Sequence, residues 1–164
     1  FDGANDYIYV ENWQASGLDD GYSLSTWFYW NGPNAYEWQF LLMQGWMSID
    51  GAAPFRIQQK NDKLYFSAQD STQGNLFTVQ TNRWYHLICI HRGTTKSMYV
   101  DGNLIHSESS NGIPSQIGSI PVKIGGEAAS PTARPWNGSI DDVRIYNRAL
   151  SLSALAALYL PENP

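Results

Sequence analysis

The sequence is poor in cysteine and in charge. Its 164 residues include a single cysteine, Cys89, so the chain cannot form a disulfide framework of its own. Cys89 stands in the apolar segment 84–90, where a buried, inert thiol is more typical than a nucleophile or a metal ligand. Lysine and arginine total 10 without clustering, and the formal net charge is −5. This balance argues against nucleic acid and against a membrane surface as partners.

Two further features are missing. The sequence has no run of about 18 apolar residues, the length expected of a membrane-spanning helix. It also has no signal peptide and opens on Phe1 in a segment that already resembles folded structure, which favours a mature or excised domain of a longer protein. At this length we expect one domain, residues 1–160, followed by the start of a linker, residues 161–164.

Aromatic residues are abundant, at 14% of the chain against 15% for all charged residues. A surface with little charge and many rings recognises ligands through aromatic faces and polar hydrogen bonds, as sugar-binding surfaces do. All-β cores also favour aromatic residues, which explains part of the excess. Trp27, Trp84 and Trp136 stand where we expect core positions.

Short segments rich in β-branched and aromatic residues alternate with turn-forming residues along the whole chain. The turn pair Asp101-Gly102 is a strong hairpin signal. Many short strands at this spacing predict an all-β protein, a two-sheet antiparallel β-sandwich of the jelly-roll type, and argue against βαβ units. The predicted strands cover residues 7–10, 22–30, 39–43, 55–59, 63–68, 76–80, 84–91, 96–100, 104–108, 122–124 and 139–146.

One short helix is predicted over residues 152–160. Ser151 is a suitable N-cap, and Pro161 ends the segment. The apolar side chains that share one face predict that the helix packs on the edge of the sandwich. They are Leu152, Leu155, Leu158 and Tyr159.

Acidic residues gather at the two ends of the sequence. Asp2 and Asn5 stand at the start, and Asp141 and Asp142 lie in the last predicted strand. If the first and last strands pair, these groups meet, and Ca²⁺ with its preference for six to eight oxygen ligands would relieve their repulsion. Because neighbouring strand residues point to opposite faces, only one of Asp141 and Asp142 should bind the ion. The alternative is that these acids are solvated or paired with Arg144 or Arg148.

The motifs, read in order, resemble the laminin-G-like, concanavalin A-like lectin/glucanase jelly-roll domains of secreted bacterial proteins. The matching segments are FDG at 1–3, NDYI at 5–8, SLSTWF at 23–28, RWYHL at 83–87, MYVDG at 98–102, VKIGG at 122–126 and NGSIDDVRIYNRALS at 137–151. The sequence departs from the family at Ala154, where a glutamate commonly completes a capping box.

The resemblance implies a module outside the cell or on its surface. In that family a structural Ca²⁺ often bridges the N- and C-terminal strands. The domains commonly serve as non-catalytic modules of polysaccharide-degrading enzymes, sialidases or adhesins. The implied partners are therefore a polysaccharide or oligosaccharide and covalently linked catalytic or adhesive domains.

Most candidates for sugar binding lie in or beside the irregular segments between residues 31 and 54. A ring can stack on the apolar C–H face of a pyranose, while nearby polar groups bind its hydroxyls. Arg134 could clamp a carboxylate or sulfate, although a plain surface arginine is the simpler reading. The candidate ligand-binding residues are Trp30, Tyr36, Trp38, Trp46, Arg56, Gln58 and Arg134.

A catalytic role has little support in the sequence. Retaining glycoside hydrolases of this fold need two carboxyl groups about 5–5.5 Å apart, in a Glu-x-Asp-x-x-Glu pattern or a close variant. None of the five glutamates stands at that spacing from another. We therefore expect a non-catalytic carbohydrate-binding module, with an adhesion, protein-interaction or spacer module as the alternative.

Overall fold

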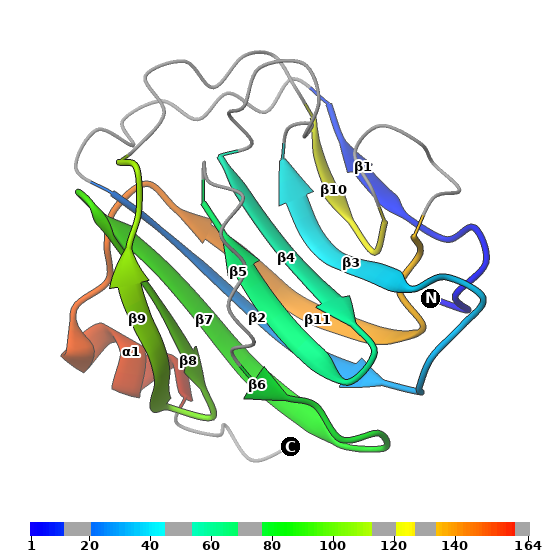
Figure 1. Ribbon diagram of the computed structural model, residues 1–164. Coiled ribbons are helices and arrows are strands. Elements are labelled where there is room, and N and C mark those ends of the chain that lie inside the picture. The colour runs from blue at the N-terminus through cyan, green and yellow to red at the C-terminus, as the bar shows by residue number, and fades with distance from the viewer. Residues whose placement is uncertain (12–20, 45–53, 69–76, 113–120, 127–133, 160–164) are drawn as a thin grey trace.

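Within the residues that the computed structural model describes (1–11, 21–44, 54–68, 77–112, 121–126 and 134–159), eleven strands form two antiparallel sheets that lie face to face (Figure 1). The first sheet has the order β1(Ile8–Val10), β10(Val122–Ile124), β3(Trp38–Gln44), β4(Phe55–Lys60), β5(Lys63–Ser67) and β6(Phe77–Thr78). The second has the order β11(Gly138–Tyr146), β2(Tyr22–Trp30), β7(Trp84–Arg92), β8(Thr95–Val100) and β9(Asn103–Ser109).

The predicted fold class is confirmed. The two sheets and the short helix α1(Leu152–Tyr159) make an all-β sandwich of the jelly-roll type, and most predicted strand bounds agree with the observed ones within one or two residues. The predicted start of a linker at residues 161–164 lies outside the described residues. No helix in the described part of the chain is long and apolar enough to cross a membrane.

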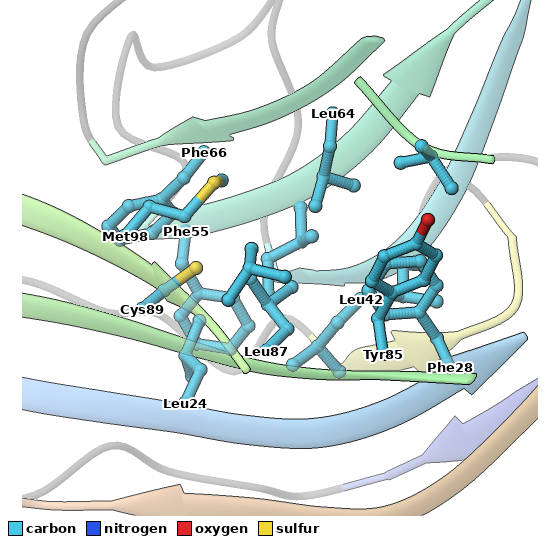
Figure 2. Packing of buried hydrophobic residues seen from close by; sticks show 14 of the residues in the cluster. Leu24, Phe28, Leu42, Phe55, Leu64, Phe66, Tyr85, Leu87, Cys89 and Met98 are labelled. Carbon is cyan, nitrogen blue, oxygen red and sulfur yellow. The ribbon is translucent and has the colours of Figure 1, made fainter. Parts of the chain in front are cut away.

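The core lies between the two sheets (Figure 2). Leu42 and Phe66 point inward from the six-stranded sheet and meet Leu87 and Met98 of the five-stranded sheet. Cys89 is fully buried there, and burial raises the pKa of its thiol well above the ordinary value. The prediction of an inert core thiol is therefore confirmed.

The N-terminus and strand β11 meet at one end of the sandwich. Asp2 forms a bridge with Asn137, and the backbone N–H of Gly138 donates to the carbonyl of Phe1 at 2.9 Å. Gly138 has φ of +150°, and a Cβ at this position would lie 1.9 Å from the Tyr29 carbonyl oxygen. Only glycine therefore lets β11 start this close to β2.

Helix α1 packs on the outer face of the five-stranded sheet. Leu155 is buried against Ile88 and Ile90, which belong to the central strand β7, so the prediction that the helix covers an edge was wrong. Leu152, predicted to share the apolar face, is 73% exposed. The predicted N-cap is confirmed, because the backbone N–H of Ala154 donates to Ser151 Oγ at 3.3 Å.

Candidate functional site

The side of the six-stranded sheet that faces away from the core carries aromatic and polar side chains, most of them buried; we call it the front face. Cross-strand register sets its composition, because side chains of paired residues share a face. One row runs from Lys123 through Met43 and Arg56 to Ser67, and a second from Phe40 through Gln58 to Tyr65. The front face consists of Tyr9, Trp38, Phe40, Met43, Arg56, Gln58, Lys60, Tyr65, Ser67 and Lys123.

Aromatic rings and cations alternate along β3 on this face. The rings of Trp38 and Tyr65 are 5.5 Å apart, and Lys60 Nζ lies 5.2 Å from the centre of the Trp38 ring. The guanidinium of Arg134 lies 5.7 Å from the centre of the Phe40 ring. The backbone carbonyl of Arg134 accepts a hydrogen bond from the backbone N–H of Phe40 at 3.0 Å. Trp38 is partly exposed, so part of its ring can reach a ligand.

The opposite edge of the front face carries two exposed tyrosines that the sequence analysis missed. Tyr7 and Tyr9 are 41% and 44% exposed. Lys123 Nζ lies 4.7 Å and 5.9 Å from their ring centres. The one signal in the sequence was the period-2 spacing of the two rings in the first predicted strand.

The floor of the front face is polar and buried. Arg56 is 3% exposed and Gln58 is 1% exposed. In the described structure Gln58 Nε2 and Ser67 Oγ are buried without a hydrogen-bond partner. Folded proteins leave few such groups unsatisfied, so a donor and a hydroxyl at this place are suited to a hydroxyl-bearing ligand or water.

Four of the predicted ligand residues come together here, namely Trp38, Arg56, Gln58 and Arg134. They reach the front face from β3, from β4 and from the segment before β11. Tyr36 is 40% exposed just before β3, where its N–H donates to Asn34 Oδ1 at 2.9 Å.

Trp30 and Trp46 have different outcomes. The prediction that Trp30 binds a ligand was wrong. The alternation of β2 turns the Trp30 side chain into the core, where it is 4% exposed. Trp46 lies outside the described residues.

The expectation of three core tryptophans was correct for Trp136, which is 0% exposed, but not for the other two. Trp84 is 43% exposed and Trp27 is partly exposed. Both lie on the outer face of the five-stranded sheet, in register with Tyr29 and His86 of the neighbouring strands.

The acidic residues at the N-terminus form a tight turn. Asp2 Oδ1 accepts from the Ala4 N–H at 2.8 Å, and Asp6 Oδ2 accepts from the Asp2 N–H at 3.0 Å. Asn5 lies between them and is exposed. A carboxylate has two acceptor oxygens, and the N-terminal ammonium of Phe1 also lies 4.0 Å from Asp6 Oδ2.

The C-terminal pair lies elsewhere. Asp2 is level with Asn137, and Asp141 follows four residues later, about 13 Å along the strand. Ligands of one Ca²⁺ lie within about 5 Å of each other. Asp142 Oδ1 pairs with Arg144 Nε at 2.7 Å, as the alternative reading expected. In the described residues no group of three or more His, Cys, Asp or Glu side chains is placed to hold a metal ion.

A bulge explains the position of Asp142. The pairing of β11 with β2 shifts between Asp141 and Arg144, and Asp142 has φ of +48°. Simple alternation therefore fails at this point of the strand, and both aspartates are exposed.

Two glutamates within the described residues form ion pairs. Glu37 pairs with Lys60 at 2.6 Å. Glu108 lies on β9 of the other sheet, near Lys96 at 3.2 Å and His106 at 3.3 Å.

A cleft of about 690 Å³ opens between β8 and the start of α1. Its serine hydroxyls pair locally, since Ser151 and Ser153 Oγ lie 2.9 Å apart and Ser97 Oγ contacts Ser107 Oγ at 2.9 Å. Arg92, also in its lining, donates to the Leu150 carbonyl at 3.3 Å. The front face, with its unpartnered buried groups, is the better candidate site.

Solved structures similar to this chain agree with the fold. A Trypanosoma rangeli sialidase in complex with 2,3-difluoro-KDN superposes with a TM-score of 0.73 at 18% identity, over 98% of this chain and 26% of the sialidase. A structure described as NanB plus Optactamide gives 0.74 at 17% identity, over 96% and 26%. The binding domain of botulinum neurotoxin DC in complex with rat synaptotagmin II gives 0.65 at 14% identity, over 93% and 39%.

The chain thus spans about a quarter of the Trypanosoma rangeli sialidase chain that it matches. No curated protein matches its sequence. The laminin G family model described as the concanavalin A-like lectin/glucanases superfamily matches residues 2–156, nearly the whole sequence. The chain belongs to the concanavalin A-like lectin/glucanases superfamily.

Proposed function

We propose that the protein is a non-catalytic carbohydrate-binding module that binds glycans through the front face. The observation that carries this proposal is the combination of accessible rings with a buried polar floor. Trp38 offers an apolar surface to the C–H face of a pyranose. Gln58 and Ser67, on the same face of the sheet, hold hydrogen-bonding atoms without partners in the described structure, and sugar hydroxyls are suitable partners for both.

The proposed role is to hold a linked catalytic domain on its substrate. When the module is bound to the polysaccharide, the linked catalytic domain stays close to its substrate. The effective concentration of the substrate around the catalytic domain is therefore high. The similarity to one segment of Trypanosoma rangeli sialidase, solved in complex with sialic acid, supports such an arrangement. We place the protein outside the cell or on its surface, consistent with a polysaccharide as ligand.

The test is a glycan array followed by affinity electrophoresis with the glycans that bind. We expect Trp38→Ala to weaken binding about tenfold, because it removes a stacking ring from the edge of the front face. Leu104→Ala is the matched control, since Leu104 is 56% exposed on β9 of the other sheet. Retention of no glycan by the wild-type protein would reject the proposal.

The second candidate is a protein-interaction or adhesion module. The similarity to the neurotoxin binding domain, which was solved with a protein partner, favours this class. The two candidates differ in the ligand that they bind. A protein-interaction module would bind no glycan on the array, and Trp38→Ala would still weaken its binding to the partner protein.

We also propose a structural Ca²⁺, restricted by the geometry to the N-terminal turn. Asp2, Asn5 and Asp6 would supply the side-chain oxygens, which suit a hard cation. The ion would stabilise the contact between this turn and Asn137, and it takes no part in ligand chemistry. Asp141 and Asp142 lie too far along β11 to join this set.

A further inference from the structure

The outer face of the five-stranded sheet carries a group of aromatic rings that α1 leaves partly open. Trp84 is 43% exposed, and Trp27 and Tyr29 are partly exposed. Large aromatic side chains on a solvent-facing sheet forgo the free energy of burying their apolar area. Exposed rings of this kind are typical of surfaces that contact a ligand. We call Trp27, Tyr29 and Trp84 the back platform.

The strands hold these rings in two ordered rows. Tyr29 pairs with Trp84 across β2 and β7, and their ring centres are 5.7 Å apart. Trp27 pairs with His86 in the next row, with stacked rings 4.9 Å apart. Successive rows on one face are two residues apart, which is about 7 Å. The rings stand on rigid strands, so a ligand would pay little to order them.

Polar groups border both rows. Ser139 and Asp141 of β11 are exposed and stand in register with Tyr29 and Trp27. The Tyr29 hydroxyl donates to Asn82 Oδ1 at 3.2 Å on the other side. Carboxylate, amide and hydroxyl oxygens next to a ring are the groups that accept hydrogen bonds from sugar hydroxyls.

The charge at this border selects the type of sugar. Asp141 carries an exposed negative charge, while Arg144 is paired with Asp142 at 2.7 Å. Burial lowers the pKa of His86 from its ordinary value of 6.5, so its ring adds no positive charge at neutral pH. A carboxylate or sulfate on the ligand would be repelled here, whereas neutral hydroxyls would be accepted.

We propose that the back platform is a second glycan-binding site, selective for neutral sugars and separate from the front face. Its ligand class rests on the proposed carbohydrate-binding function. Its residues and its selectivity rest on the outer face of the five-stranded sheet alone.

The experiment compares the wild-type protein with Trp84→Ala, Trp38→Ala and the double variant. Calorimetric titration uses neutral cello-, manno- and xylo-oligosaccharides and acidic oligogalacturonates. We expect Trp84→Ala to weaken binding of at least one neutral glycan about tenfold, with no loss of oligogalacturonate binding. Trp84→Phe should recover most of the affinity, because it restores a stacking ring. Thermal melting of each variant checks that it remains folded.

A direct readout locates the ligand. The indole N–H resonance of Trp84, assigned by its loss in Trp84→Phe, should shift when the neutral glycan is added. An unchanged resonance, or neutral-glycan affinity that Trp38→Ala removes and Trp84→Ala leaves intact, would overturn the second site while the proposed function stands. Binding lost only in Trp84→Ala would support the second site and reject the front face. Absence of any glycan binding would overturn both.

Discussion

At the scale of single residues, His86 is a buried group whose protonation should be coupled to folding. It is 2% exposed, and its ring stacks between Trp27 at 4.9 Å and Tyr159 at 6.0 Å. Burial lowers the pKa of His86, while the charges of Asp101 and Asp142 oppose this shift. The unfolded chain therefore binds more protons below about pH 6.5, so the free energy of unfolding falls as the pH falls through this value.

We expect the melting temperature of the wild-type protein to drop between pH 7.5 and pH 5.5, and to drop less in His86→Phe. Phenylalanine keeps a ring between the same neighbours and cannot be protonated, although it loses the contact of Nε2 with Ser25 Oγ at 3.0 Å. His106→Gln, at a partly exposed position, is the control and should retain the pH dependence. Equal slopes in wild type and His86→Phe would refute this assignment.

The side chains that could not be predicted show what the sequence leaves open. Alternation indicates which residues of a strand share a face, but it does not say which of two apolar faces meets the other sheet. Trp30 and Trp84 illustrate the problem, because each was assigned to the opposite environment. The burial of Arg56 and Gln58 depends on neighbours from distant segments, which no local pattern contains.

At the scale of elements, Leu155 is the side chain of α1 that is buried against the sheet, while Tyr159 stacks on His86. Leu155 is 4% exposed and packs with Ile88, Ile90 and Leu150. Leu155→Ala should lower the free energy of unfolding by about 2–4 kcal/mol, through lost burial and the cavity left behind. Leu152→Ala should change it by less than about 0.5 kcal/mol, because Leu152 is 73% exposed. Urea denaturation measures both, and equal effects would mean that the helix does not depend on this contact.

The elements themselves were largely predictable. Turn chemistry set the strand ends, as at Asp101 and Gly102, whose φ angles of +49° and +76° match a two-residue hairpin turn. The bulge near Asp142 was not predictable, because an inserted residue in β11 carries no local signal in an acidic stretch. The place of α1 was also missed, since its apolar face fits a sheet face and a sheet edge equally well.

At the scale of the whole molecule, the sandwich presents aromatic groups on both of its outer surfaces. Trp38 and Tyr65 stand on the six-stranded sheet, and Tyr29 and Trp84 on the five-stranded sheet. The core between them explains why a change on one surface should leave the other intact, since separated sites are usually additive. This separation is what allows single variants to assign each glycan to one face.

The proposed Ca²⁺ acts on the molecule as a whole, because the N-terminal turn closes onto the start of β11. An ion that binds only the folded state stabilises it by mass action, by about 2.7 kcal/mol at a hundred times its dissociation constant. We expect millimolar Ca²⁺ to raise the melting temperature and EDTA to reverse the rise. Asp2→Asn and Asp6→Asn should abolish this response.

Asp141→Asn is the matched control, because it removes the same charge about 13 Å along the strand from the turn. If Asp141→Asn removes the response and Asp2→Asn does not, the ion lies at β11 and the assignment to the N-terminal turn is wrong. If Ca²⁺ leaves the melting temperature of the wild-type protein unchanged, the hydrogen bonds of Asp2 and Asp6 within the turn hold it closed without a metal. Scanning calorimetry with and without Ca²⁺ at low ionic strength separates these outcomes, since screening by salt is then smallest.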